Sequence, residues 1–418
     1  NAIYFNPIFQ STANHRYHTY DYYQVDPILG GNEAFRTLVD AAHRRSMRIV
    51  IDGVFNHASR GFFQFNHILE NGPQSPYLDW FIVNGFPLNA YTDEEPPNYA
   101  AWWNLPDLPK LNTDNDRARE FLMGVAEHWI REGIDGWRLD VPLDIKTPGF
   151  WETFRQRCKA VNPEAYILAE IWEQGAEWLQ GEHFDGVMNY VLNRACLGFF
   201  GGRSLDTSFQ PGGFPIARLD GPAFAAVVER AMEAIPWAIT LTQLNLLSSH
   251  DMPRFLTLIR GDKRRMKLAV PFQIAFQGAP CVYYEDEIGL QGGRDPDNRR
   301  AFPWDESQWD TDLRDWFRRC IALRHEYAAL RRGSFEPVYA GESAYAFARH
   351  LDGTTMIAAF NACEWETTID LPLPECVADQ PVVEDIFSVK SHPVEEGHIE
   401  LAMPALSGTL LRCIENPG

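Results

Sequence analysis

The chain has 418 residues, of which 45% are hydrophobic and 22% are charged, a balance typical of a globular protein with a sizeable core. Its 37 Lys and Arg residues stand against 57 Asp and Glu residues, which gives a net charge of −20. A surface this acidic repels phosphate groups, so we expect neither a nucleic acid nor an anionic membrane surface as a partner.

The seven cysteines are scattered, and none lies in a C-x-x-C pair or in a Cys/His cluster with zinc spacing. We therefore expect free thiols in a reducing compartment, which favours a cytoplasmic protein. No basic segment followed by an apolar run lies near Asn1, so no signal peptide is predicted. The chain begins without Met inside an apolar run, and we expect its natural start to lie further upstream.

Short apolar runs alternate with amphipathic stretches along most of the chain. Nearly continuous apolar runs are typical of parallel strands that are covered on both faces. The predicted strands are Ala2–Phe5, Arg48–Asp52, Gly136–Asp140, Tyr166–Glu170, Phe184–Met188, Gln243–Leu247 and Pro280–Tyr284. The predicted helices are Glu33–Arg45, Asp116–Glu132, Phe150–Ala160, Phe224–Ala234, Arg264–Gln277 and Asp312–Leu330.

This repetition of strand and helix predicts an α/β fold, and two forms compete: a doubly wound sheet and a (β/α)8 TIM barrel. No Gly-rich phosphate loop follows any predicted strand, which disfavours the doubly wound, nucleotide-binding form. A barrel needs eight strands. The seven predicted here indicate that the first barrel strand is missing from the chain.

The expected domain boundaries follow from two changes in pattern. The interval after the predicted strand Arg48–Asp52 is Pro-rich and too long for one crossover, so residues 57–112 are expected to form an inserted B-type subdomain after the third barrel strand. The barrel then comprises residues 1–56 and 113–332. From residue 333 to residue 418, short alternating runs separated by turns predict a C-terminal antiparallel β-sandwich.

Polar side chains gather where the predicted parallel strands end, and these residues are Asp52, Asn56, His57, Arg138, Asp140, Glu170, His250 and Asp251. In a (β/α)8 barrel these strand ends converge on one mouth, where the active site lies. Each residue alone has an ordinary explanation, such as a helix cap or a structural histidine. Their recurrence at the same end of successive strands favours an active site.

Two carboxylates that face one another suit glycoside hydrolysis, in which one acts as nucleophile and the other as general acid. Arg138 lies two residues before Asp140, so both side chains are expected on the same face of the strand. A neighbouring guanidinium keeps a nucleophilic carboxylate ionised. Glu170 is then the expected acid/base, and Asp251 a third carboxylate that holds sugar hydroxyls.

Four short motifs accompany these residues. D-x-x-x-N-H begins at Asp52, G-x-R-x-D begins at Gly136, the strand Ile167-Leu-Ala-Glu170 ends in the acid, and an H-D pair begins at His250. With these motifs the sequence resembles the α-amylase family of glycoside hydrolases. The resemblance implies retention of anomeric configuration, with Asp140 as nucleophile, Glu170 as acid/base and Asp251 as transition-state stabiliser.

The same resemblance implies residues that bind the sugar. His57 and His250 are expected at subsite −1 with Asn56 in support, and Tyr17 is expected to stack on the same sugar. The segment Leu108-Pro-Lys110-Leu-Asn112 is similar to the M-P-K-L-N signature of neopullulanases, cyclomaltodextrinases and maltogenic amylases.

Similarity to that group also implies outer contacts. Asp297 and Arg299 are expected to touch sugars beyond −1, with an exposed loop salt bridge as the alternative. Trp172 is expected to stack on a sugar in the acceptor subsites, with core packing as the alternative.

Two departures from the group border the acceptor sites. Val141-Pro-Leu-Asp144 stands where the group has V-A-N-E, and Glu173 stands where it has His. The balance of hydrolysis and transglycosylation is therefore left open. The group's N-terminal β-domain, which often builds its dimer, does not occur in this chain, so a homodimer is left open too. No cofactor is required and no metal site is assigned. The Asp/Asn-rich stretch Asn112–Asp116 leaves calcium binding as an alternative, but it lacks a calcium-ligand loop pattern and is predicted to be a helix cap.

The sequence thus predicts a retaining hydrolase of α-1,4 bonds in cyclodextrins, pullulan and short maltooligosaccharides, with transglycosylation as a second outcome. Three alternatives remain. An α-1,6-glucosidase or a sucrose-acting relative is disfavoured by Lys110 in the L-P-K-L-N segment. A non-catalytic glucan-binding homologue is disfavoured because all three carboxylates are present. A fragment that does not fold alone is the third.

Overall fold

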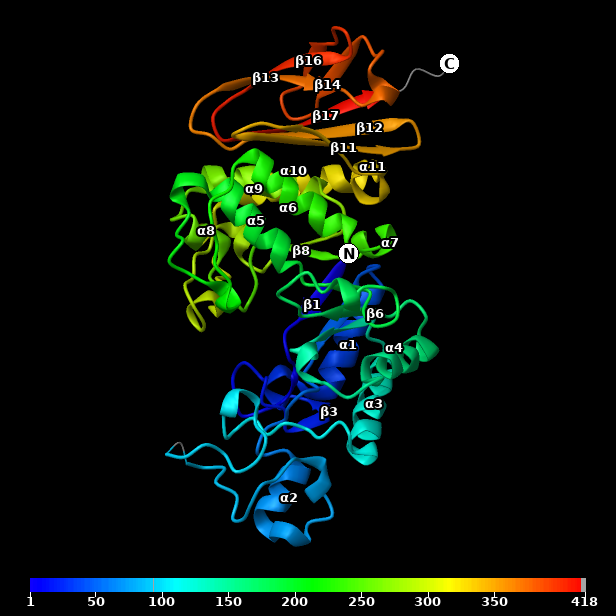
Figure 1. Cartoon of the computed structure of the whole chain (residues 1–418), viewed down its shortest axis with the longest axis vertical. Coiled ribbons are helices and arrows are strands. Elements are labelled where there is room, and N and C mark those ends of the chain that lie inside the picture. The colour runs from blue at the N-terminus through cyan, green and yellow to red at the C-terminus, as the bar shows by residue number, and fades with distance from the viewer. Residues whose placement is uncertain (93, 415–418) are drawn as a thin grey trace. The chain divides into compact units, whose positions relative to one another are not determined.

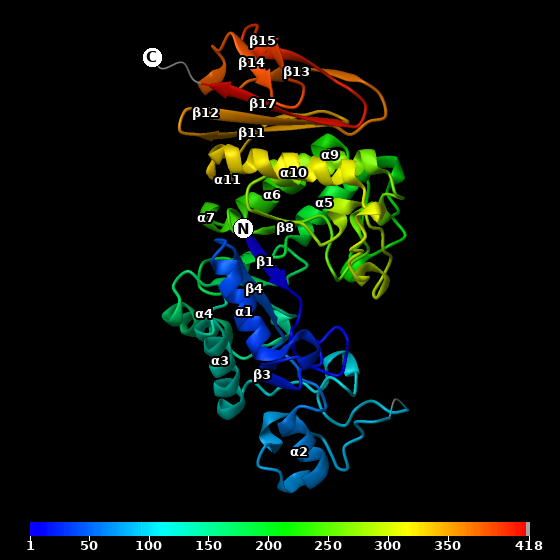
Figure 2. The ribbon, with the colours of Figure 1, turned by 180° about the vertical axis from the view of Figure 1, so that it is seen from behind.

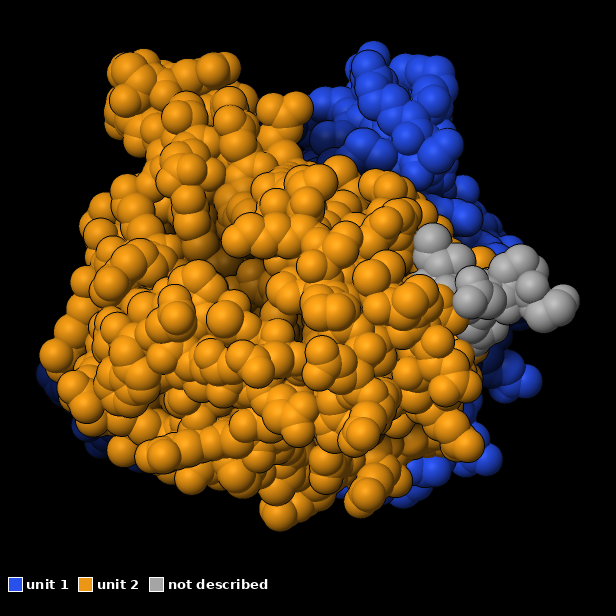
Figure 3. All heavy atoms as spheres, turned by 90° about the horizontal axis from the view of Figure 1, so that it is seen from above, with its two compact units in different colours: residues 1–171, 177–187 blue, residues 172–176, 188–418 orange. Residues whose placement is uncertain are grey.

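The computed structural model describes residues 1–92 and 94–414. They form two compact units: one consists of the described residues within 1–171 and 177–187, and the other of those within 172–176 and 188–418. Figures 1 and 2 show the ribbon from opposite sides, and Figure 3 distinguishes the two units by colour. Within the described ranges, every helix is too short or too polar to cross a bilayer.

The first unit is built on a parallel sheet with strand order β1-β4-β5-β6-β7. Its strands are β1 (Ala2–Phe5), β4 (Arg48–Gly53), β5 (Gly136–Leu139), β6 (Tyr166–Ala169) and β7 (Gly186–Val187). The first four coincide with the predicted strands to within one residue. Helices α1 (Gly31–His43), α3 (Asp116–Arg131) and α4 (Phe150–Val161) lie around this sheet (Figures 1 and 2). This alternation confirms the predicted α/β class.

Helix α3 shows why the sequence folds as predicted. Its buried residues include Leu122, Val125, Ala126 and Trp129, which recur at helical spacing and form one apolar face of the helix. The helix begins after Asn115, whose side-chain oxygen accepts hydrogen bonds from the backbone N–H groups of Arg117 and Ala118 at 3.1 and 3.0 Å. The predicted helix cap within Asn112–Asp116 is therefore confirmed.

Residues 57–112 follow an irregular path between β4 and β5. This segment contains α2 (Phe63–Asn71) and several isolated antiparallel bridges, among them His57 with Lys110 and Phe81 with Leu111. Between β1 and α1, the short strands β2 (Phe9–Gln10) and β3 (Asp21–Val25) pair antiparallel. None of these elements was predicted. Strands this short give no periodic signal, and the many prolines around α2 obscure its pattern.

In the second unit, β8 (Leu244–Leu246) and β9 (Ala279–Cys281) form a parallel pair. β8 lies within the predicted strand Gln243–Leu247, whereas β9 begins one residue before the predicted strand Pro280–Tyr284 and ends three residues before its end. The helices are α5 (Tyr190–Gly201), α6 (Gly221–Glu233), α7 (Trp237–Thr240), α8 (Phe255–Leu258), α9 (Lys263–Ala275), α10 (Thr311–Glu326) and α11 (Ala328–Arg332). The predicted helix Asp312–Leu330 is thus divided, because Tyr327 has extended backbone angles. Helix α5 was not predicted, since it is buried on nearly all sides and shows no polar face.

The predicted C-terminal β-sandwich is confirmed. One antiparallel sheet has the order β10-β11-β12-β17-β14-β15, and the other pairs β13 with β16. The strands are β10 (Glu336–Ala340), β11 (Ala344–Leu351), β12 (Thr354–Asn361), β13 (Thr367–Pro372), β14 (Val382–Asp385), β15 (Lys390–Pro393), β16 (His398–Met403) and β17 (Ser407–Ile414). Ile357 and Leu411 from one sheet pack against Leu371 and Leu401 from the other. The strand pairings of the described residues give a five-stranded parallel sheet and a separate parallel pair. Closure of an eight-stranded barrel therefore stays a prediction.

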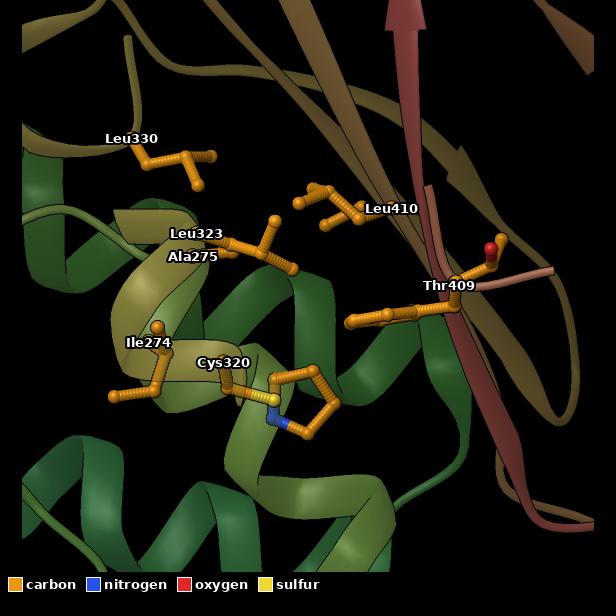
Figure 4. A pocket seen from close by; sticks show the side chains of 10 residues that line it. Ile274, Ala275, Cys320, Leu323, Leu330, Thr409 and Leu410 are labelled. Atoms are coloured by element: carbon orange, nitrogen blue, oxygen red, sulfur yellow. The ribbon is translucent and has the colours of Figure 1, made fainter. Parts of the chain in front are cut away.

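A second apolar layer joins this sandwich to the helices of the same unit. Side chains of α9, α10 and α11 meet those of β12 and β17, and Figure 4 shows Leu323 and Leu330 on the helix side of this seam and Thr409 and Leu410 on the strand side. The narrow gap there is lined almost wholly by apolar atoms, which is typical of a dry packing defect and not of a ligand site.

Arg349 of β11 ties the sandwich to the ends of two helices. Its fully buried guanidinium donates to the carbonyl oxygens of Ala275 (2.9 Å) and Leu330 (3.1 Å), and also to those of Gly333 (2.9 Å) and Ser334 (2.8 Å). These carbonyls lie at or after the ends of α9 and α11, where a helix leaves its last acceptors without partners. One side chain therefore satisfies acceptors from three segments.

We expect Arg349→Met to lower the free energy of unfolding by about 3 kcal/mol or more, because four hydrogen bonds to main-chain carbonyls are lost, three of them buried. Urea unfolding measures the change. The control is Arg412→Met, which removes a more exposed arginine paired with Glu384 and should cost less than ~1 kcal/mol. Equal losses for the two variants would contradict this account.

Candidate active site

A buried arginine gathers three carboxyl groups in the first unit. The Nη1 atom of Arg138 donates to both oxygens of Asp52, at 3.1 and 3.0 Å, and to Oδ1 of Asp140 at 3.1 Å. Its Nη2 atom lies 3.1 Å from Oε2 of Glu170. The side chains of Arg138 and Asp52 are fully buried, and those of Asp140 and Glu170 are 9% and 8% exposed. One positive group thus faces three acids, two of which retain some access to solvent.

The register of the parallel strands brings these groups together. Asp52 of β4 is the direct neighbour of Arg138 on β5, and Leu139 of β5 is the neighbour of Ala169 on β6. Asp140 and Glu170 each follow by one residue, so they leave adjacent strands at the same level. Adjacent strands are ~4.8 Å apart. The two carboxylates are therefore presented side by side at the carboxyl end of the sheet.

Asp52 is held in place by two phenol groups. The hydroxyls of Tyr4 and Tyr17 donate to its Oδ2 atom at 2.9 and 3.0 Å. Burial raises the pKa of the Asp52 carboxyl to about 6, against the opposing effects of Arg138 and the Tyr4 hydroxyl. A carboxyl group with no exposed surface serves here as a fixed partner of Arg138, and it leaves contact with a ligand to the two more accessible acids.

The acid at Glu170 has a further partner at the start of the next loop. The backbone N–H of Val141 donates to Oε2 of Glu170 at 3.0 Å. Val141 itself adopts a left-handed conformation, with φ at 36° and ψ at 50°. This conformation is unfavourable for a β-branched residue. The chain nevertheless holds it where the N–H can orient the carboxyl group next to Asp140.

His57 and Asn56 follow β4 in the same unit, and both are buried. Burial lowers the pKa of the His57 imidazole to about 3, with smaller contributions from nearby His18 and Lys110. The ring is therefore neutral above this pH. Nδ1 lies 3.2 Å from the Asn56 amide nitrogen, whereas Nε2 has no hydrogen-bond partner among the described residues. A buried nitrogen in this state is suited to a hydroxyl group of a ligand.

Two tryptophans extend from this histidine toward solvent. The His57 ring stacks on Trp102, with centroids 5.1 Å apart and planes 18° apart, and Trp102 stacks on Trp103 at 4.4 Å and 12°. The Trp102 indole N–H donates to Oδ2 of Asp144 at 2.9 Å, and the Lys110 ammonium donates to the Asp144 carbonyl at 3.2 Å. Trp103 is 77% exposed. This stack was not predicted; its one signal in the sequence is the pair of adjacent tryptophans shortly before the L-P-K-L-N segment.

His250 and Asp251 belong to the second unit, in the loop after β8. The Tyr190 hydroxyl donates to Oδ2 of Asp251 at 3.0 Å, and His250 Nε2 lies 3.1 Å from Oδ1. Arg299 donates from Nε to the His250 carbonyl at 2.9 Å, and its Nη2 lies 3.7 Å from Asp251. The predicted pair is thus held from several directions within its own unit.

The other residues expected to contact sugar in this unit have protein partners. Trp172 stacks on Tyr190, with centroids 3.7 Å apart and planes 6° apart, and a Cβ atom added to Gly212 would come within 2.5 Å of the Trp172 ring. Asp297 accepts a hydrogen bond from the Gly293 N–H at 2.6 Å and pairs with Arg300. The expected sugar contacts of Trp172, Asp297 and Arg299 stay predictions.

Comparison with known proteins decides the family. Residues 1–329 match the family described as alpha amylase, catalytic domain. The chain belongs to the alpha-amylase family. Relatives of this family imply a TIM barrel followed by a C-terminal β-sandwich.

A crystal structure of a Thermus thermophilus protein is 48% identical with a TM-score of 0.95, and the match covers 98% of this chain and 86% of that one. The Nostoc punctiforme debranching enzyme in its native form is 45% identical with a TM-score of 0.92, over 98% of this chain and 85% of that chain.

Among characterised sequences, a Bacillus cyclomaltodextrinase is 41% identical over 365 residues, which is 86% of this chain and 62% of the relative. Neopullulanase 2 of Thermoactinomyces vulgaris is 39% identical over 376 residues, which is 90% of this chain and 61% of the relative. The chain therefore spans about three fifths of the length of these two relatives.

The buried His57 generates a prediction about stability and pH. The pKa of its imidazole falls from 6.5 to about 3 on folding, so the unfolded chain binds the proton more tightly between these values. The stability contributed by the neutral ring is present above pH 6.5 and is lost as the pH falls toward 3. In His57→Gln we expect the slope of unfolding free energy against pH to decrease by up to ~1.4 kcal/mol per pH unit in this window. Urea unfolding from pH 7 to pH 4 measures it, and an unchanged slope would contradict the burial of a neutral ring.

Proposed function

We propose that this protein is a retaining α-glucan hydrolase in which Asp140 is the nucleophile and Glu170 the acid/base. The observation that carries the proposal is the pair of carboxylates on adjacent strands that share the guanidinium of Arg138. The strand spacing of ~4.8 Å suits the separation of roughly 5–5.5 Å that retaining glycosidases use, and is too small for the water that an inverting enzyme places between its acids.

The proposed reaction has two displacements. Asp140 attacks the anomeric carbon while Glu170 gives its proton to the leaving glycosidic oxygen, so the C–O bond breaks and a β-linked glycosyl ester forms. Glu170 then takes a proton from water, the water oxygen attacks the same carbon, and the ester bond breaks to give an α-configured product. Arg138 keeps Asp140 ionised, and the Val141 N–H orients Glu170.

Further parts of the site are proposed from family membership. Asp251 would stabilise the charge that develops on the sugar, and His250, His57 and Tyr17 would bind the sugar at subsite −1. Residues 57–112 would form the inserted subdomain after the third strand of an eight-stranded barrel. We propose that the reaction needs no cofactor, since acid/base and nucleophile are both supplied by the chain.

The proposed substrates are cyclodextrins, pullulan and short maltooligosaccharides cleaved at α-1,4 bonds, with transglycosylation as a second outcome. The names of the cyclomaltodextrinase and neopullulanase relatives support this. A second candidate is cleavage of α-1,6 bonds, because the Nostoc relative at 45% identity is named a debranching enzyme. Incubation with cyclodextrin, pullulan, maltotriose and isomaltose in parallel distinguishes the two, and absence of sugar release from all four would refute both.

We also propose a cytoplasmic location, in line with the intracellular maltogenic amylase of Bacillus subtilis that is 37% identical over 365 residues. A homodimer remains a proposal to be settled by sedimentation. The net charge of −20 supports the proposal that neither nucleic acid nor a membrane surface is a partner.

The roles of Asp140 and Glu170 can be distinguished by comparing two substrates with different leaving groups. On maltotriose, we expect Asp140→Asn and Glu170→Gln each to lower kcat by ~10² or more. On maltosyl fluoride, whose leaving group needs no proton, Glu170→Gln should regain the glycosylation step and Asp140→Asn should not. The control is Asp135→Asn, a buried acid at the opposite end of the same strand, paired with Arg48 and His43, which should keep wild-type kcat. Wild-type turnover by Asp140→Asn would overturn the assignment of the nucleophile.

The exposed Trp103 suits a flat, uncharged sugar face, because its ring is supported by Trp102, which in turn stacks on His57. We expect Trp103→Ala to raise KM for maltooligosaccharides about fivefold, equivalent to about 1 kcal/mol, with kcat little changed. Initial-rate kinetics provide the measurement. Trp365→Ala, which removes an exposed tryptophan of the sandwich, is the control and should leave KM unchanged. An unchanged KM in Trp103→Ala would remove Trp103 from the site.

A further inference from the structure

The loop that carries His250 and Asp251 is wrapped around one amide group. The side-chain nitrogen of Asn298 donates to the carbonyl oxygen of His250 at 2.8 Å and to that of Met252 at 2.9 Å, and the Ser249 carbonyl lies 3.5 Å from the same nitrogen. Asn298 belongs to the 3-10 helix Asp297–Arg299 and has no exposed surface. Acceptors on both sides of Asp251 are therefore fixed by one side chain from another loop.

The chemistry of the group explains why asparagine is suited to this position. A primary amide nitrogen carries two hydrogens in a fixed plane, so it can serve two carbonyl groups at once. The orientation of the amide is set by its neighbours, because only the nitrogen can face a cluster of carbonyl oxygens. The other end of the group, Oδ1, is buried and lacks a hydrogen-bond partner among the described residues. Burying this oxygen without a donor costs free energy. The hydrogen bonds of the amide nitrogen must therefore contribute more than this cost.

Further contacts hold the loop of His250 and Asp251 against the loop that leads to Asn298. Arg299 adds a second donor to the His250 carbonyl at 2.9 Å. The backbone N–H of Arg254 donates to the Gly292 carbonyl at 3.0 Å, and a Cβ atom added to Gly292 would lie 2.7 Å from the Cα atom of Asn298. The loop before Asn298 is therefore packed so tightly that only glycine fits at position 292. All of these residues belong to the second unit.

We propose that Asn298 is a positioning residue that fixes the backbone on both sides of Asp251, and so sets the place of this carboxylate for glycoside cleavage. The inference rests on the proposed function of Asp251. Asn298 itself touches no substrate. Its effect passes through the carbonyl groups of residues 250 and 252, between which Asp251 has little freedom to move.

The first test is Asn298→Leu, which keeps the approximate volume and removes both donors. We expect kcat on maltotriose, per folded molecule, to fall ~10- to 100-fold with KM changed less than ~3-fold, because an interaction that acts in the transition state is lost. The control is Asn361→Leu. Asn361 is equally buried and also donates to main-chain carbonyls, those of Trp365, Met403 and Pro404, but it lies in the sandwich. It should lose stability and keep kcat; an equal fall in kcat for both variants would overturn the proposal.

A double-variant cycle tests the connection to Asp251. With maltosyl fluoride as substrate, we expect Asn298→Leu to slow the wild-type enzyme and to have no further effect in Asp251→Asn, because both changes disable the same carboxylate. Losses that multiply would show that Asn298 acts elsewhere and would overturn the proposal.

If Asn298→Leu does not fold, Asn298→Asp tests the same proposal. When ionised, the new carboxylate would face carbonyl oxygens without a donor; when protonated, it could donate one hydrogen bond. The ratio of variant to wild-type kcat should therefore rise as the pH is lowered, and a ratio independent of pH would overturn the proposal. If the wild-type protein hydrolyses none of the glucans, the proposed function fails together with this inference. If the wild-type protein is active and the Asn298 variants match it, this inference alone fails.

Discussion

The guanidinium of Arg138 is the interaction on which the chemistry of the first unit depends. Removing an arginine and three carboxyl groups from water is costly unless each finds partners. Here Arg138 donates to Asp52, Asp140 and Glu170 together, and Asp52 gains two phenol hydroxyls besides. Because the partners come from three adjacent strands, the cluster forms only when the sheet has its correct register. Folding and assembly of the acids are therefore one event.

The two units hold their acids by different means. In the first, Asp140 and Glu170 leave adjacent strands, so hydrogen bonding of the sheet itself sets their spacing. In the second, Asp251 lies on a loop, where no sheet register acts, and Asn298 and Arg299 bind the carbonyl groups of that loop. A loop can thus be given some of the rigidity of a strand by a buried donor that binds its backbone.

Much of this could be read from the sequence, for identifiable reasons. The strands β4, β5 and β6 are buried along nearly their whole length, so each is largely a run of apolar residues with clear ends. The spacing of Arg138 and Asp140 predicted their pairing because alternate residues share a face of a strand. Helix α5 could not be found, since a segment buried all round carries no period. The break at Tyr327 within the last predicted helix also left no signal, as neither Gly nor Pro marks it.

The parts of the site that were missed depend on the path of loops. The stacking of His57 on the Trp102–Trp103 pair, and the contact of Lys110 with Asp144, join segments far apart in sequence and outside the strands and α-helices. The hydrogen bonds from Asn298 to the carbonyls of His250 and Met252 also join two loops that are far apart in sequence. No local pattern distinguishes an asparagine that donates to two buried carbonyls from one that faces solvent.

Strand β12 is buried along almost its whole length because it packs on both faces. One face contributes to the core of the sandwich, and the other packs against helices α9, α10 and α11. The C-terminal sandwich therefore does not behave as an exchangeable module. A chimera between family members that joins one parent's sandwich to another parent's helices would pair surfaces that were never selected to fit. Crossovers placed before α9, which carry helices and sandwich together from one parent, would preserve this seam.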